Sequence, residues 1–267
     1  MTTFALKEDR VRVERHRVES IDVLVYRADD AISDGFSPYV KCAVLPAFCD
    51  WAAEHGLRAL GYYASRESFW VGDLKRECDK RAIKAVITHP RTKEPPPWAR
   101  AIGDSLVLLK PNVYQVNFNI SRKQLFDRFA ETGLMLPMGI DVFAFVDLQT
   151  KFFKRYALPK AASYIVPTGS GTALSCLALA LSNKQSCTLH GVVSRPIKSV
   201  QRVIENNIAM KTTPMIELHD DSTDGHDATA DDAPWPVSKG WERRAYAWLK
   251  SNISSLTQPI CFVSLGR

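Results

Sequence analysis

The hydrophobic pattern along the chain alternates between short continuous apolar runs and longer stretches in which apolar positions recur every three or four residues. The short runs predict strands and the recurring spacing predicts helices. Strands are predicted at residues 21–26, 57–63, 83–88, 105–109, 187–193 and 260–264. Helices are predicted at residues 40–55, 65–81, 122–131, 141–156 and 241–251. Because strands and helices take turns, we predict an α/β fold with mainly parallel sheets flanked by helices.

One turn of small residues stands between an apolar, strand-like run and an Ala/Leu-rich, helix-like run. The turn consists of Thr168, Gly169, Ser170, Gly171 and Thr172. In this order of elements, free backbone N–H groups and the positive end of the helix dipole converge on the turn. The glycines allow close approach of the backbone, and the hydroxyls of Ser170 and Thr172 add donors. The segment therefore predicts a site for a phosphorylated ligand.

The turn alone does not identify that ligand. Its pattern is neither Gly-x-Gly-x-x-Gly nor a loop ending in Gly-Lys-Ser/Thr, so a dinucleotide fingerprint and a nucleoside-triphosphate loop are both unsupported. Short glycine turns also occur between strands and helices for packing reasons alone. The alternative interpretation is therefore a turn without a ligand.

Composition limits the class of protein. The chain has 267 residues, enough for a large core and two lobes, and lacks an apolar run long enough to span a bilayer. The first ten residues contain no apolar signal core, so we expect a cytoplasmic protein. Six cysteines without a CxxC pair are expected to be reduced and mostly buried, and six dispersed histidines predict no metal site.

The charge is basic but uneven. The formal net charge is +6, and six aspartates fall within residues 219–233, which predict an exposed insertion. Without those six aspartates the rest of the chain carries +12. The basic residues are densest at 7–17 and 75–84. This balance permits binding to a polyanion, and a solvated basic face is the alternative.

The order of the segments resembles the fold type II pyridoxal-phosphate enzymes, nearest to the aminocyclopropane-carboxylate deaminase and D-cysteine desulfhydrase branch. Members have a strand ending in Lys-Arg-Asp-Asp, a short loop, and an Asn-Lys that opens a helix. Here Arg27-Ala28-Asp29-Asp30 is followed by Pro38-Tyr39-Val40-Lys41. The resemblance implies that Lys41 is the Schiff-base lysine, which holds pyridoxal 5′-phosphate; a surface lysine is the alternative.

Two further motifs match the family in part. Members carry a Ser-x-Gly-Asn or Gln-Ser-Asn-His loop, whose asparagine contacts the 3′-oxygen of the pyridine ring and whose helix carries the substrate carboxylate. Residues 64–69 stand in that place, with Ser65 matching and Ser68 replacing the asparagine. Residues 168–172 resemble the family's Gly-Ser-Gly-Gly-Thr phosphate cup with one glycine fewer. The resemblance thus implies catalytic roles for Ser65 and Ser68 and cofactor binding by the turn.

The C-terminal part continues the resemblance. Residues 235–240 are similar to Asp-Pro-Val-Tyr-x-Gly but lack the tyrosine, and residues 262–266 resemble the last core strand and its Thr-Gly-Gly. That strand supplies the hydroxyl partner of the pyridine nitrogen in many members, which makes Ser264 the candidate here. A neutral serine would leave this nitrogen unprotonated and favour eliminations and replacements.

The resemblance also implies an architecture and a mechanism. Residues 1–56 and 150–267 would form a large cofactor-binding lobe, residues 57–149 a small lobe, and the cofactor would lie between them. An incoming α-amine would displace Lys41, whose freed amine would then move protons at the α-carbon. Decarboxylation, elimination and deamination of an amino-acid-like substrate are all compatible with this mechanism. Relatives are commonly homodimers, and we expect the same here.

The substrate admits several hypotheses. The altered 65–68 loop and the basic surface suggest an amino acid attached to hypermodified thymine in duplex phage DNA, with Arg66 binding a carboxylate or phosphate in an infected host cell. A free amino-acid lyase or deaminase is the first alternative. A non-catalytic protein that binds a phosphorylated ligand is the second. A sugar-phosphate enzyme in which Lys41 is an ordinary lysine is the third.

Overall fold

The structure is a computed structural model. It describes residues 4–7, 10–65, 68, 70–90, 94–109, 133–137, 139–182, 186–194, 196–209, 213–220, 232–238 and 240–266. The predicted helix at 122–131 and Arg66 lie outside the described residues, as do residues 221–231 of the acidic segment. Among the helices that the structure describes, none has the length and apolar character needed to cross a membrane.

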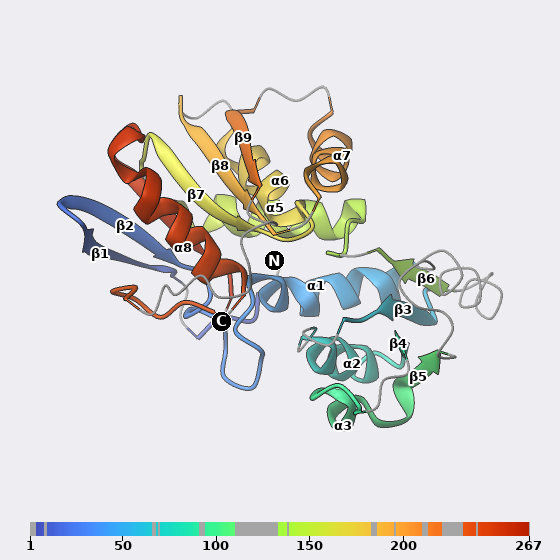
Figure 1. Ribbon diagram of the computed structural model, residues 1–267. Helices are drawn as coiled ribbons and strands as arrows, with labels where there is room; N and C mark the ends of the chain where they lie inside the picture. The colour runs from blue at the N-terminus through green and yellow to red at the C-terminus, as the bar shows by residue number, and fades with distance from the viewer. Residues whose placement is uncertain are drawn as a thin grey trace.

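The larger sheet has six strands in the order β1-β2-β10-β7-β8-β9 (Figure 1). Their bounds are β1 (Arg12–Val18), β2 (Ile21–Arg27), β7 (Ser163–Thr168), β8 (Thr188–Val193), β9 (Met215–Asp220) and β10 (Ile260–Ser264). β1 pairs antiparallel with β2, and the other neighbours are parallel. β7 and β10 are buried along their whole length, which accounts for their near-continuous apolar sequences.

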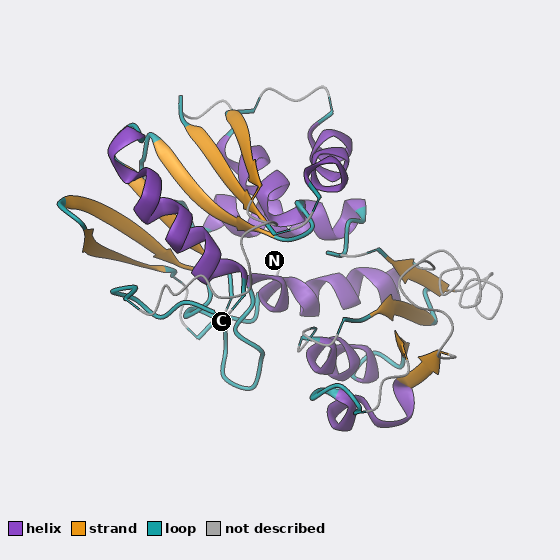
Figure 2. Ribbon diagram, in the orientation of Figure 1, coloured by secondary structure: helices purple, strands orange, loops and turns teal. Residues whose placement is uncertain are grey.

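The smaller sheet has four parallel strands in the order β5-β4-β3-β6. Their bounds are β3 (Ala59–Tyr63), β4 (Lys84–Pro90), β5 (Leu106–Leu109) and β6 (Gly133–Leu136). Helix α2 (Val71–Asp79) packs on β4, followed by α3 (Ala99–Ile102) and the short 3₁₀ helix η1 (Gly103–Ser105). Figure 2 shows both sheets with their flanking helices. The predicted α/β fold with mainly parallel sheets is confirmed.

Helices cover both faces of the larger sheet. They are α1 (Val40–Glu54), α5 (Phe143–Arg155), α6 (Thr172–Leu181), α7 (Ile197–Ile208) and α8 (Trp241–Asn252), which the 3₁₀ helix η2 (Ile253–Ser255) follows. Along β7, Tyr164 packs into a core with Leu177 of α6, whereas Ile165 packs into a second core with Leu249 of α8. This alternation follows from the two-residue period of a strand.

The core on the α6 face extends into the smaller sheet, because α1 packs against both α5 and α2. Residues on α1 and on β3 therefore belong to one continuous hydrophobic cluster. The predicted boundary between the lobes, at residues 149 and 150, lies inside α5. The two-lobe division stays a prediction, although the strands of each sheet come from separate parts of the chain.

Several local predictions need correction. β1, β6, β9, α3 and α7 were not predicted. β1 and β9 lie at edges of the larger sheet, where polar side chains mask the apolar pattern, and β6 is a four-residue strand at an edge of the smaller sheet, too short to show a clear period. His219 and Asp220 belong to β9, so the predicted insertion does not begin at residue 219. The helix predicted from residue 65 begins at Val71. All six cysteines are unpaired and buried, as the sequence predicts.

Candidate active site

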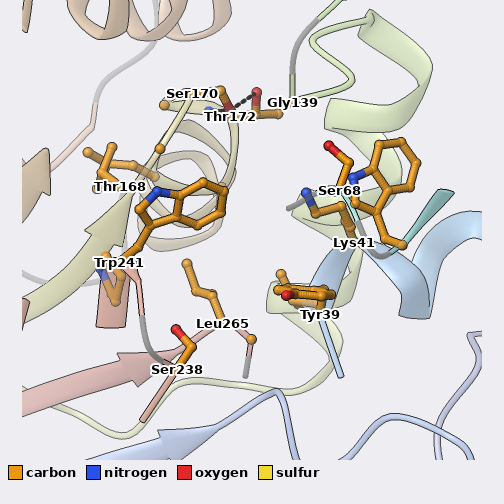
Figure 3. A pocket seen from close by; sticks show the side chains of 18 of the residues that line it. Tyr39, Lys41, Ser68, Gly139, Thr168, Ser170, Thr172, Ser238, Trp241 and Leu265 are labelled. Carbon is orange, nitrogen blue, oxygen red and sulfur yellow. Dashed lines mark hydrogen bonds between the residues drawn. The ribbon is translucent and has the colours of Figure 1, made fainter. Parts of the chain in front are cut away.

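A cavity lies between the two sheets, where the start of α1, the turn at residues 65–68, the loop from β7 to α6 and the C-terminal end of the chain meet (Figure 3). It brings together predicted site residues that are far apart in the sequence. Those that line it are Lys41, Ser65, Ser68, Thr168, Gly169, Ser170, Gly171 and Thr172. The ninth, Ser264, lies deeper in the molecule and is described below.

Lys41 is the second residue of α1 and points into the cavity (Figure 3). Its Nζ lies 4.9 Å from the ring centroid of Trp70 and 5.7 Å from that of Tyr39, so two aromatic side chains flank the amine. The start of α1 is fixed to the chain end, because the Val40 N–H donates to the Leu265 carbonyl at 2.8 Å. These contacts hold the Lys41 amine in a defined position at the cavity wall.

The turn at residues 65–68 is fixed by its own hydrogen bonds. The Ser68 N–H donates to the Ser65 carbonyl at 3.1 Å, and the Ser65 N–H donates to Ser68 Oγ at 3.0 Å. The two hydroxyl oxygens are 3.0 Å apart. Trp98 Nε1 donates to the Ser65 carbonyl at 3.1 Å and anchors the turn from outside. Both serines therefore present small polar groups to the cavity on the same side as Lys41.

The loop from β7 to α6 has the geometry of an anion cradle. Gly171, with φ of +95°, precedes the first residue of α6 and supplies no side-chain cap, and the Thr172 N–H makes a long hydrogen bond of 3.4 Å to Ser170 Oγ. Ser170 Oγ and Thr172 Oγ1 are 3.2 Å apart. A Cβ placed on Gly139, whose φ is +83°, would lie 2.0 Å from Ser170 Oγ. The loop thus offers N–H groups and hydroxyls, and glycine at 139 is what lets a second segment close over them.

Trp241 forms the wall opposite Lys41, and sequence reasoning missed it (Figure 3). A Cβ on Gly169 would lie 3.4 Å from the Trp241 ring, an ordinary van der Waals contact, so the indole packs directly beside the loop. Thr168 is almost fully buried, and its hydroxyl donates to the Val166 carbonyl at 2.8 Å. The Thr168 hydroxyl is therefore committed to the backbone of its own strand.

Among the described residues that line the cavity, Glu242 is the acidic one, and sequence reasoning missed this residue too. Its Oε1 accepts hydrogen bonds from the Leu265 N–H at 2.7 Å and the Gly266 N–H at 3.1 Å. Ser264 is fully buried behind it, and its hydroxyl donates to the same oxygen at 3.0 Å. Oε2 accepts from the Ser238 N–H at 3.2 Å. The chain end therefore wraps around one carboxyl group.

The pKa of Glu242 is raised from 4.5 to about 7. Burial is the largest cause, the nearby Asp29 carboxylate also raises the pKa, and the backbone N–H groups partly oppose both effects. Asp29 itself makes a bidentate pair with buried Arg27, with both distances 3.0 Å. Glu242 can therefore change protonation state near neutral pH. In the sequence it resembles an ordinary acidic residue in the first turn of a helix, which is why the pattern alone did not reveal it.

Comparisons with known proteins bear on the fold. No family model matches the chain, and no curated protein matches it in sequence. A solved structure of an ACC deaminase homologue matches with a TM-score of 0.77 and 14% identity, covering 100% of this chain and 92% of that one. A fungal L-serine ammonia-lyase from Rhizomucor miehei matches with a TM-score of 0.67 and 14% identity, covering 99% and 94%.

A third match is threonine deaminase isoform 2 from Solanum lycopersicum, with a TM-score of 0.64 and 13% identity, covering 97% of this chain and 84% of that one. The similarity runs over nearly the whole chain in all three cases. The chain has the fold of the fold type II pyridoxal-phosphate enzymes. At these identities the comparison establishes the fold, and the chemistry must be argued from the cavity.

Proposed function

We propose that the chain is a pyridoxal-phosphate-dependent enzyme that acts at the α-carbon of an amino-acid-like substrate by elimination or deamination. The observation that carries the proposal is the position of Lys41, which shares one cavity with the glycine-containing loop at the start of α6. Such a cofactor requires an amine and a phosphate cradle within one site. Solved structures with this fold include an ammonia-lyase and a deaminase, which supports the reaction class.

The residues present fit this cofactor. The N–H groups and hydroxyls of residues 169–172 suit a dianionic phosphate, and Lys41 suits an aldehyde. When bound, pyridoxal phosphate supplies a carbonyl for the lysine and an electron-withdrawing ring beside the substrate's α-carbon. Tyr39 and Trp241 provide apolar walls that exclude water from the reacting atoms.

The chain's own residues divide the remaining work. Once substrate is bound, the Lys41 amine takes and returns the proton at the α-carbon. The hydroxyls of Ser65 and Ser68 bind the substrate carboxylate at the turn. Glu242, with its pKa near 7, holds a proton at the base of the cavity for a basic atom of the bound ring. Ser264 orients that carboxyl group, and its direct contact with a cofactor stays a prediction.

Two classes of substrate are candidates for this reaction. A free amino acid is the first candidate. An amino acid attached to duplex phage DNA is the second, and the charge of +12 outside the six clustered aspartates favours it. Measurable binding to duplex DNA at low salt, weakening steeply as salt rises, would support it, and an absence of binding at low salt would eliminate it.

The visible absorption spectrum of the purified chain, with and without added pyridoxal phosphate, tests the cofactor. We expect a visible band in the wild-type chain and in Lys151→Ala, an exposed control on α5, and its loss in Lys41→Ala. Borohydride reduction followed by peptide mapping should place the pyridoxyl group on Lys41. A band that survives Lys41→Ala, or a label on another lysine, would overturn the assignment.

A second experiment tests the reaction class. The loaded enzyme is incubated with a panel of L- and D-amino acids bearing a leaving group at the β-carbon, and the release of ammonia and 2-oxo acid is measured. Elimination or deamination predicts equal amounts of the two products. Release of carbon dioxide instead would show a decarboxylase.

A further inference from the structure

Three potential metal ligands meet on the larger sheet, and they lie outside the residues that line the cavity. His190 is on β8 and is the register partner of Glu217 on β9. His219 lies two residues beyond Glu217 on the same strand, so both side chains project from the same face of the sheet. The pairing of adjacent parallel strands thus converts a dispersed set of residues into a cluster, contrary to the expectation from histidine spacing.

The distances within this cluster match those between ligands of one metal ion. His190 Nδ1 lies 3.1 Å from His219 Nε2 and 3.3 Å from Glu217 Oε2, and the latter two atoms are 3.9 Å apart. Ligands bound at about 2.1 Å to a tetrahedral ion are separated by about 3.4 Å. The three atoms therefore already have nearly the spacing that a single ion requires.

Hydrogen bonding alone does not satisfy these three atoms well. When His190 Nδ1 carries a proton, that proton can make a linear bond to only one of His219 Nε2 and Glu217 Oε2, so the other acceptor has no well-aligned donor in its short contact with Nδ1. If Nδ1 instead accepts from His219, the contact with Glu217 brings two acceptors together. One cation between the three atoms would satisfy all of these lone pairs at once.

The surroundings hold the ligands in place and leave access from solvent. The ring of Trp248, on α8, stacks on His219 with centroids 4.2 Å apart and lies 5.6 Å from His190. The His190 side chain is only 9% exposed, whereas those of His219 and Glu217 are 26% and 43% exposed. Two ligands thus lie on an open edge strand, which leaves room for water as a further ligand.

We propose that His190, Glu217 and His219 form a binding site for one divalent transition-metal ion of the Zn²⁺ class. Two imidazoles and one carboxylate are a donor set that such ions prefer, and hard cations such as Mg²⁺ favour oxygen ligands instead. The ion would join β8 to the edge strand β9, and its binding would therefore stabilise this edge of the sheet. The site is separate from the cavity and does not depend on the proposed function.

Titration calorimetry with Zn²⁺ alone, on the full chain after removal of metals with a chelator, tests the site. We expect one equivalent to bind with a dissociation constant of about 10 μM or less, and the same concentration of Zn²⁺ to raise the melting temperature. His219→Ala and Glu217→Gln should each weaken binding by about tenfold or more, because each removes one of three ligands. His55→Ala, an exposed histidine on another helix end, should bind like wild type.

The same variants distinguish this site from binding at the buried cysteines. Co²⁺ in place of Zn²⁺ should give weak visible bands without the intense thiolate charge-transfer absorption of a cysteine site. Zn²⁺ binding of unchanged affinity in both His219→Ala and Glu217→Gln would overturn the proposal, as would wild-type binding weaker than about 1 mM. Glu217→Gln keeps the shape of a half-exposed side chain, and its near-ultraviolet circular dichroism checks that it folds.

Discussion

The two ends of the cavity differ in the groups that they present to a ligand. At one end, residues 169–172 and Gly139 present backbone N–H groups and hydroxyls, with uncharged side chains held close by glycines. At the other end, Glu242 and Ser264 form a buried polar network next to Asp29. The first end selects a ligand by shape and fixed dipoles, and the second responds to pH. Substitutions at the first should alter ligand binding, and those at the second should alter pH dependence.

The largest effect should come from Gly139→Ala at the first end. Its Cβ would lie 2.0 Å from Ser170 Oγ, so either the cradle opens or Gly139 moves. Overpacking of this kind costs about 1–3 kcal/mol, which corresponds to roughly a fivefold to 150-fold loss of affinity for pyridoxal phosphate. Equilibrium titration of the visible band measures the affinity.

Gly35→Ala is the matched control for that change. Gly35 has a φ of +84°, close to the +83° of Gly139, and nothing lies within 4 Å of its added Cβ. Both alanines therefore suffer the same backbone strain, and only Gly139→Ala creates the clash. Equal affinities for the cofactor in the two variants would show that the cradle is not where the phosphate binds.

The position of the glycine-containing loop, between a strand and a helix at the cavity, could be predicted from the sequence for a physical reason. The cradle is continuous in sequence, and its function depends on small residues between a strand and a helix, which is a local pattern. Lys41 was assigned from the family resemblance, which places the Schiff-base lysine after a strand and at the start of a helix, and its role stays a prediction. The alternation of elements was equally local, so the α/β fold was predicted correctly.

The second end could not be found in this way. Its network is assembled from residues 29, 242 and 264, and only tertiary folding brings them together. Glu242 is unremarkable in its own helix, and its burial depends on the chain end that wraps around it. The pairing of β8 with the edge strand β9 poses the same problem. The sequence of neither strand indicates by itself that Glu217 is the register partner of His190. Long-range contacts therefore limit what the sequence alone predicts.

At the second end, the larger effect should come from Glu242→Gln, on the pH dependence of stability. The pKa of Glu242 is raised from 4.5 to about 7 in the folded chain, so folding favours the protonated form. The stability that this group contributes is complete below about pH 4.5 and is lost as the pH rises through about 7. This difference in pKa corresponds to roughly 3 kcal/mol. The amide introduced by the substitution cannot titrate, so the unfolding free energy of the variant should not fall by this amount as the pH rises from about 4.5 to about 7.

Urea unfolding at a series of pH values between about 4 and 8 measures that decline. The quantity to compare between Glu242→Gln and the wild-type chain is the slope of the unfolding free energy against pH. Their absolute stabilities also differ, because the amide NH₂ of the variant would face the Ser238 N–H and lose a hydrogen bond. Glu54→Gln, at the end of α1, serves as an exposed control that should keep the wild-type slope. A wild-type slope in Glu242→Gln would show that another group causes the decline.

The smallest effect should come from Ser264→Ala, and it tests whether Ser264 acts through Glu242. The substitution removes a hydrogen bond to the ionised carboxylate, so the pKa of Glu242 should rise above its wild-type value and the decline in stability should move to higher pH. Ser163→Ala is the matched control, because that serine is equally buried in a neighbouring strand and donates to the Thr257 carbonyl at 2.8 Å. Each change should cost about 1 kcal/mol at low pH, since each removes one buried hydrogen bond. Only Ser264→Ala should move the pH at which half of the decline in stability has occurred. Equal midpoints in the two variants would show that Ser264 does not affect the titration of Glu242.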